Sequence, residues 1–197
     1  MPAPLRTIHI PVMGFTQTTK NPTGLETLWQ MLRELSSPTD SVQGPASWKD
    51  DPEAKAGLVG RNTELDAKIN VFAYSWGAGW FFPRFAQALQ RWGRSIDNVV
   101  LCDPVYRSPR LLFRGRSLLN RVWAPSIRIP SNVRRVQIYR QKTDKPSGHR
   151  VIPIDPRRTE IVSDVLIRDT PHVRMDDLPE FHNLCLKLSR EITSCDC

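Results

Sequence analysis

The sequence predicts an α/β fold, an open and mostly parallel sheet of about five to six strands flanked by helices. Two predicted strands, Ile69–Tyr74 and Asn98–Cys102, are nearly continuous apolar runs, and such strands are buried on both faces, as in parallel sheets. A helical pattern joins them, and the alternation of strands with helices along the chain favours a sheet wound with helices. The 197 residues suffice for one domain with a sizeable core, so residues 1–197 are interpreted as a single domain.

Five strands are expected along the chain. Each is short and rich in apolar or β-branched residues. They are placed at Thr7–Met13, Ile69–Tyr74, Asn98–Cys102, Val133–Tyr139 and Ile161–Ile167. In an open parallel sheet the functional site lies beyond the carboxyl ends of the strands. This rule directs attention to Gly14–Phe15, Ser75, Asp103, and the segments after Tyr139 and Ile167.

Helical spacing of apolar residues predicts the remaining elements. Helices are expected at Thr23–Leu35, within Asp51–Leu65, at Ala78–Trp92, and from about Leu178 onward. Thr23 followed by Glu26 is typical of a capping box. Pro83 is acceptable because it lies in the opening turns of its helix. The polar segment Ser36–Asp51 is expected to be a loop.

Ser75 lies between an apolar strand and the next helix, where the chain must turn sharply. Small residues stand two positions before it and two after it, at Ala73 and Gly77, and Gly79 allows the helix to approach the sheet. Such a turn exposes the serine hydroxyl at the edge of the sheet. It also directs the helix N-terminus, with its unpaired N–H groups, at a developing oxyanion.

This arrangement resembles the nucleophile elbow of the α/β hydrolases, G-x-S-x-G, with Ala73 in place of the first glycine. Some small lipases of that family carry the same alanine. The resemblance implies that Ser75 is a nucleophile and that the Trp76 N–H is one oxyanion donor. The second donor is expected after the first strand, where Met13–Thr16 is similar to the family's His-Gly-x segment. The resemblance implies that the second oxyanion donor is the N–H of Phe15, or alternatively that of Gly14.

The same resemblance implies a histidine after the last strand and before the last helix. His172, in Thr170–Asp177, has that position, so it is the expected general base. His9 lies within a strand, His149 in a loop and His182 in the final helix, and none of them fits.

Two aspartates compete for the role of the acid that orients His172. Asp103 ends an apolar strand directly, and a minority of the family, including lipases of the pancreatic type, uses that position. Asp144 follows the next strand, which is the more common family position, but it lies among lysines. Asp103 is favoured narrowly and Asp144 stays open.

A basic segment separates the third and fourth predicted strands. Arg107–Arg135 contains eight arginines and no acidic residue, interleaved with large apolar side chains. In α/β hydrolases this connection often forms a cap, so residues 107–135 are a candidate lid, and a basic amphipathic segment suits an anionic membrane surface. Nucleic acid is not expected to be a partner, because there are too few aromatic residues for a stacking platform.

The resemblance therefore implies a serine hydrolase that cleaves carboxylic esters, thioesters or lipids through an acyl-enzyme, without a cofactor or a metal. The sequence shows neither zinc-ligand spacing nor a glycine-rich phosphate loop. The alternatives are a catalytically inactive binding protein on the same fold, using its arginine-rich surface, and an amidase or peptidase. A small-molecule or lipid ester is the expected ligand.

Charge and cysteine content bear on the environment. The formal net charge is +8, which favours anionic partners. No apolar run approaches the ~20 residues of a membrane span, and Met1–Arg6 lacks a signal-peptide pattern. A cytoplasmic location with reduced cysteines is expected.

Overall fold

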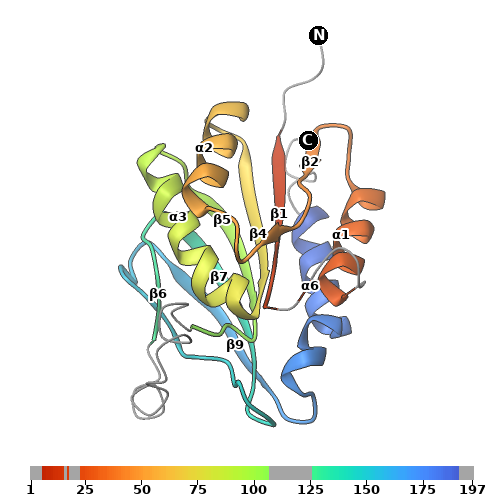
Figure 1. The fold of residues 1–197 in the computed structure, drawn as a ribbon. Coiled ribbons are helices and arrows are strands. Elements are labelled where there is room, and N and C mark those ends of the chain that lie inside the picture. Colours follow the sequence, from red (N-terminus) through yellow and green to blue (C-terminus); the bar gives the residue numbers. More distant parts are fainter. Residues whose placement is uncertain (1–5, 16, 18–22, 107–125, 191–197) are drawn as a thin grey trace.

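The structure is a computed structural model that describes residues 6–15, 17, 23–106 and 126–190. Its main sheet has the strand order β2-β1-β4-β5-β7-β9, and the short strand β3 also pairs with β1. All of these pairs are parallel. The predicted fold class, an open parallel sheet flanked by helices, is therefore confirmed (Figure 1).

The five predicted strands are present with nearly the expected ends. They are β1 (Thr7–Met13), β4 (Lys68–Tyr74), β5 (Ile96–Cys102), β7 (Val133–Gln141) and β9 (Glu160–Ile167). The inner strands β1, β4 and β5 are almost entirely buried. In contrast, no residue of the edge strand β9 is fully buried.

Helices cover both faces of the sheet (Figure 1). On one face α2 (Pro52–Asn62) and α3 (Phe82–Arg91) pack on alternate side chains of β1, β4, β5 and β7. On the other face α1 (Gly24–Leu35) and α6 (Pro179–Arg190) pack on the side chains in between. The two hydrophobic cores thus fix the sheet between the helix layers and hold its carboxyl end in place.

The prediction that Ser36–Asp51 is a loop is partly wrong, because this segment contains the short strands β2 (Asp40–Val42) and β3 (Ala46–Ser47). Two further short strands, β6 (Ile127–Ile129) and β8 (Val151–Pro153), form a separate parallel pair. None of the four is longer than three residues. Segments this short show no readable alternation, so they become strands only because a neighbouring strand supplies hydrogen-bond partners.

The predicted capping box of α1 is not formed. Thr23 occupies the N-cap, but its side chain makes no capping hydrogen bond. Instead the Leu25 N–H donates to Asp176 Oδ2 at 3.0 Å, from a carboxylate more than 150 positions away in the sequence. A tertiary contact has therefore replaced the local cap, and it links the start of α1 to the segment that follows His172.

The predicted helix Ala78–Trp92 begins as a different helix type. Residues Gly77–Phe81 form a π-helical turn, η1, which continues into α3. Pro83 lies in the first positions of α3, where the missing N–H is tolerated. Wide turns of this type are common at functional sites, and this one begins two residues after Ser75.

Candidate active site

Ser75 occupies a tight turn between β4 and η1. Its φ is 52°, in the left-handed region that residues with a Cβ rarely adopt. A Cβ on Gly77 would lie 2.5 Å from the carbonyl oxygen of Met13, and one on Gly79 would collide with the carbonyl of Val105. Gly77 and Gly79 are thus required by the close approach of the end of β1 and of the segment after β5.

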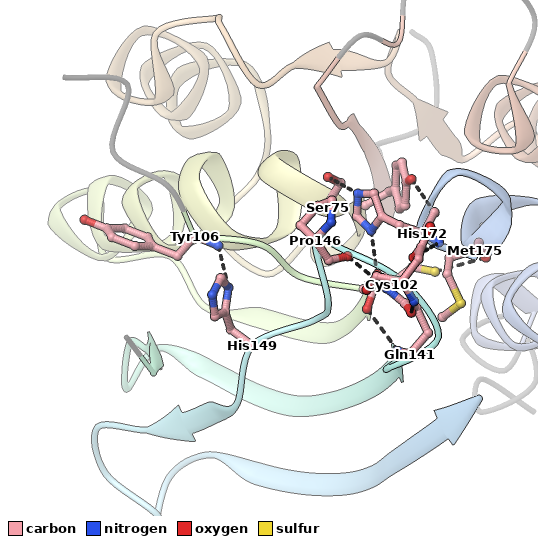
Figure 2. A network of polar contacts seen from close by, with 11 residues as sticks. Ser75, Cys102, Tyr106, Gln141, Pro146, His149, His172 and Met175 are labelled. Carbon is pink, nitrogen blue, oxygen red and sulfur yellow. Dashed lines mark hydrogen bonds and ion pairs between the residues drawn. The ribbon is translucent and has the colours of Figure 1, made fainter. Parts of the chain in front are cut away.

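His172 lies in η2 (His172–Asp177), a 3₁₀ segment after β9 and before α6. The Ser75 hydroxyl and His172 Nε2 are 2.9 Å apart, and His172 Nδ1 lies 2.5 Å from Asp103 Oδ2. Figure 2 shows the ring of His172 between Ser75 and the end of β5. Ser75, His172 and Asp103, predicted from distant parts of the chain, are therefore connected by a continuous chain of hydrogen bonds.

Asp103 is completely buried and has a φ of 41°. Both carboxylate oxygens accept hydrogen bonds from Gln141: Oδ1 from the backbone N–H and Oδ2 from the side-chain Nε2, each at 3.0 Å. Because a carboxylate only accepts hydrogen bonds, the proton on the imidazole lies at Nδ1. Nε2 is then left to accept the proton of the Ser75 hydroxyl.

Asp144, the competing aspartate, contacts His172 at a different atom. Its Oδ1 accepts a hydrogen bond from the backbone N–H of His172 at 2.8 Å. Its own N–H donates to Gln141 Oε1 at 3.0 Å. The structure therefore brings both aspartates to His172, but only Asp103 contacts the imidazole ring.

The loop that carries His172 is also fixed by two residues that sequence reasoning did not select. Tyr74 donates its hydroxyl to the His172 carbonyl at 2.6 Å, and its ring stacks on the imidazole. Cys102 donates its thiol to the Met175 carbonyl at 3.1 Å (Figure 2). Burial raises the pKa of both groups above their ordinary values, so both remain protonated donors. Each stands one position before a predicted site residue, which is the only sequence signal for them.

Asp176 was also missed. It is buried, and its Oδ2 accepts from Gln17 Nε2 at 2.5 Å as well as from the Leu25 N–H. Burial raises the pKa of the Asp176 carboxyl, and the hydrogen bond from Leu25 opposes that rise. The oxygen of the Gln17 amide accepts from the Gly14 N–H at 2.8 Å. The loop after β1 is thereby connected to the loop of His172.

The three candidate oxyanion donors lie around the Ser75 turn but differ in their surroundings. The Gly14 N–H is paired with Gln17, so it could serve an oxyanion only if Gln17 moved. Trp76 opens the helical run after Ser75, where N–H groups lack partners in the preceding turn. The rings of Phe15, Trp48 and Trp76 pack on one another with centroids 4.6–5.5 Å apart. Donation by Trp76 and Phe15 stays a prediction.

The candidate lid at 107–135 falls into two parts. Residues 107–125 lie outside the described residues, and the remainder includes β6 and the start of β7. Arg134 pairs with Asp97 at 2.9 Å and Arg135 with Glu160 at 3.8 Å. Although the segment itself contains no acidic residue, these two arginines have carboxylate partners on the neighbouring strands β5 and β9.

Within 6–15, 17, 23–106 and 126–190, no group of three or more His, Cys, Asp or Glu residues could hold a metal ion. No helix in that part of the chain combines the length and apolar character needed to cross a membrane. Cys102 and Cys185 are free and buried. The other two cysteines, Cys195 and Cys197, are outside the described residues.

Comparison with solved structures identifies the fold as the α/β-hydrolase type, the fold that the elbow pattern implies. RedJ, a thioesterase from the prodiginine biosynthetic pathway of Streptomyces coelicolor, is similar with a TM-score of 0.52 and 13% sequence identity. That match covers 97% of this chain and 87% of RedJ. A second RedJ structure, with a PEG molecule bound in its active site, gives a TM-score of 0.52 at 12% identity, over 97% and 95% of the two chains.

A more distant similarity is to the Vlm2 thioesterase domain, with a TM-score of 0.46 at 13% identity over 96% of this chain and 95% of that domain. No family model matches the sequence, and a search of curated proteins found no significant relative.

Proposed function

We propose that this protein is a serine hydrolase that cleaves carboxylic esters, thioesters or lipids through an acyl-enzyme. The main support for the proposal is the chain of hydrogen bonds from Ser75 through His172 to the buried Asp103. A serine is a weak nucleophile by itself, and an adjacent oriented base is the usual means of activating it.

In the proposed reaction, the Ser75 oxygen adds to the substrate carbonyl while His172 Nε2 takes the hydroxyl proton. The resulting imidazolium is stabilised by Asp103, which keeps the imidazole proton at Nδ1. The carbonyl oxygen becomes an oxyanion, and the N–H groups of Trp76 and Phe15 stabilise it. When the tetrahedral intermediate collapses, the leaving group departs with the proton from His172 and the acyl group stays on Ser75.

Deacylation repeats these steps with water as the nucleophile. His172 takes a proton from the water, the hydroxide adds to the acyl carbonyl, and the Ser75 oxygen leaves with the proton returned by His172. The products are a carboxylic acid and the free enzyme, so no cofactor or metal is required. The strained backbone at Ser75 and Asp103 supports this assignment, because such conformations cluster at active sites.

The substrate class is proposed on two grounds. RedJ, which shares the fold, is described as a thioesterase, and this supports including thioesters. The rings of Phe15 and Trp48 pack on the ring of Trp76, the residue after Ser75, and this aromatic cluster would favour an apolar acyl group. A cytoplasmic location and a lid at 107–135 that contacts anionic membranes stay predictions.

Hydrolysis of an activated ester and of an acyl thioester by the purified protein tests the proposal. Ser75→Ala should lower turnover of both by about 10⁴- to 10⁶-fold while circular dichroism and the unfolding temperature stay unchanged. Turnover retained in Ser75→Ala would exclude Ser75 as the nucleophile. A wild-type protein without turnover would favour the inactive binding protein instead.

A further inference from the structure

A cleft of about 410 Å³ lies between α3 and the small β6–β8 sheet. Its size is within the range of sites for small organic ligands. It is lined by Arg84 and Gln87 of α3, by Tyr106 after β5, and by Arg128 of β6. None of these residues has a role in the proposed reaction, so the cleft requires a separate explanation.

The cleft begins about one helical turn beyond Ser75. Gly79, which lines it, follows Ser75 by four residues in the same helical run. Tyr106, also in the lining, follows Val105, whose N–H donates to the Ser75 carbonyl at 3.0 Å. Figure 2 shows Tyr106 beside the helix that starts at Ser75, with its N–H donated to His149. A substrate held at Ser75 would have to extend past Val105, whose carbonyl packs against Gly79, to reach the cleft.

The cleft is positively charged. Among the described residues that line it, two are arginines and none is acidic. Within the described ranges neither Arg84 nor Arg128 forms an ion pair, whereas Arg91, Arg134, Arg135, Arg140 and Arg157 all pair with carboxylates. Such an arrangement favours an anionic ligand, since guanidinium groups bind carboxylates and phosphates through paired hydrogen bonds.

The guanidinium of Arg84 is held in place. It lies 3.4 Å from the centroid of the Trp80 ring, and its Nη1 donates to the Trp80 carbonyl at 2.9 Å. The side chain thus folds back one turn towards Ser75. Trp80 is five residues beyond Ser75, an axial rise of roughly 8 Å. Because the ring and the carbonyl already fix the guanidinium, little side-chain entropy would be lost when it binds an anion.

We propose that this cleft binds an anionic group, a carboxylate or a phosphate, at a distance from the ester bond that Ser75 attacks. This inference rests on the proposed function and narrows its substrate class to esters or thioesters that carry such a group. Arg84 and Arg128 are the residues that would recognise the anion, and Gln87 lies beside them in the lining. The anion would need a spacer of several atoms, because the guanidinium is not adjacent to Ser75.

Two matched pairs of substrates test the proposal and separate the two sources of the anion. One pair is p-nitrophenyl esters whose acyl chain ends in a carboxylate or in a methyl group. The other is thioesters whose leaving group ends in a phosphate or in a hydroxyl. Each pair is assayed with the wild type, Arg84→Gln, Arg128→Gln and the double variant. Arg91→Gln is the control, because Arg91 lies on the same helix and pairs with Glu53 outside the cleft.

For one of the two anionic substrates, kcat/KM should fall about tenfold in each single variant and more in the double variant. For the neutral substrate of the same pair, kcat/KM should stay within about twofold of the wild type. Arg91→Gln should not change kcat/KM for either substrate. Whichever pair shows the loss identifies the anion as part of the acyl group or of the leaving group. Equal losses for the charged and neutral substrates, or no losses at all, would overturn the proposal.

Binding to Ser75→Ala keeps this inference separate from the proposed function. Calorimetry should show that Ser75→Ala binds the anionic substrate more tightly than the neutral one, and that adding Arg84→Gln removes the difference. If binding behaves in this way while the wild type lacks turnover, the hydrolase proposal fails and the anion site stands. If Ser75→Ala shows no preference for the anionic substrate, the anion site is excluded even when esters are hydrolysed.

Discussion

Asp103 and Asp144 both contact His172, from the ends of neighbouring strands of the sheet, yet they differ in almost every physical respect. Asp103 is fully buried, has a left-handed φ, and contacts the imidazole Nδ1. Asp144 is half-buried and contacts the backbone N–H of the same residue. Gln141 joins them, since its Nε2 donates to Asp103 and its Oε1 accepts from the Asp144 N–H.

Both carboxylates are close to His172, but the atoms they contact indicate two different functions. A carboxylate at Nδ1 sets the tautomer of the ring and stabilises its protonated form, so it acts on the reaction. A carboxylate that accepts from the backbone N–H positions the loop of His172. It can affect the reaction only by changing where the imidazole ring lies. We therefore expect substitutions at the two aspartates to differ greatly in their effects on turnover.

Substitution of Asp103 should have the largest effect. In Asp103→Asn the side chain keeps its size but can donate as well as accept, so the ring can adopt the tautomer with its proton at Nε2. That tautomer cannot accept the Ser75 proton, and kcat on an activated ester should fall by about 10³- to 10⁴-fold. Steady-state kinetics measures the effect, with thermal unfolding as a check on the fold. Activity within tenfold of the wild type would contradict the role of Asp103.

A second way to disturb Asp103 leaves the carboxylate itself intact. A Cβ added at Gly148 would overlap Asp103 Oδ1 and also approach Arg140 Cγ at 3.0 Å. Gly148→Ala should therefore displace the carboxylate and lower kcat by about 10- to 100-fold. Gly44→Ala is the matched control, because a Cβ there meets nothing within 4 Å. Equal activity in the two variants would show that the position of Asp103 is not critical.

Removal of Asp144 should have a smaller effect. Asp144→Ala takes away the acceptor for the His172 N–H, which should lower the free energy of unfolding by about 1 kcal/mol and kcat by less than tenfold. Denaturant unfolding and ester hydrolysis measure the two quantities on the same preparation. A loss of turnover as large as that of Asp103→Asn, without unfolding, would reverse the assignment of the two aspartates.

A buried histidine outside the site should affect stability but not turnover. Burial lowers the pKa of His9 from 6.5 to about 4, against a smaller opposing effect of Asp40. The folded state therefore favours the neutral ring. The stability this gives is complete above pH 6.5 and is lost as the pH falls towards 4, by at most about 3 kcal/mol.

Replacing His9 by glutamine should reduce this acid-dependent loss and leave kcat at neutral pH unchanged. The free energy of unfolding of both proteins, measured by urea titration between pH 6.5 and 4, gives the two slopes. Identical slopes would mean that His9 does not carry the acid sensitivity. Reduced turnover at neutral pH would mean that His9 also influences the candidate active site around Ser75.

The sequence predicted the fold and the region of the site because both depend on strong local patterns. Apolar runs such as Ile69–Tyr74 show that a strand is buried on both faces, and the small residues around Ser75 are dictated by a cramped turn. The position of His172 followed from the order of elements in α/β hydrolases. The catalytic roles of these residues stay predictions, as do those of Trp76 and Phe15.

Other features depend on contacts between distant segments, which no local pattern reveals. Thr23 and Glu26 have the spacing of a capping box, but Asp176 arrives from another part of the chain and takes the capping role. The two aspartates could not be separated either, because the outcome depends on how the loop after β7 folds back on Gln141. The pairing of Arg134 with Asp97 likewise depends on strand neighbours.

The most direct test of the central claim is the rate at which a fluorophosphonate probe labels Ser75, with the labelled peptide identified by mass spectrometry. The wild type should be labelled at Ser75, Asp144→Ala should react within tenfold of its rate, and Asp103→Asn should react about 10³-fold more slowly or more. Labelling at another residue, or equal rates in all three proteins, would contradict the assignment of Ser75, His172 and Asp103 as a catalytic unit.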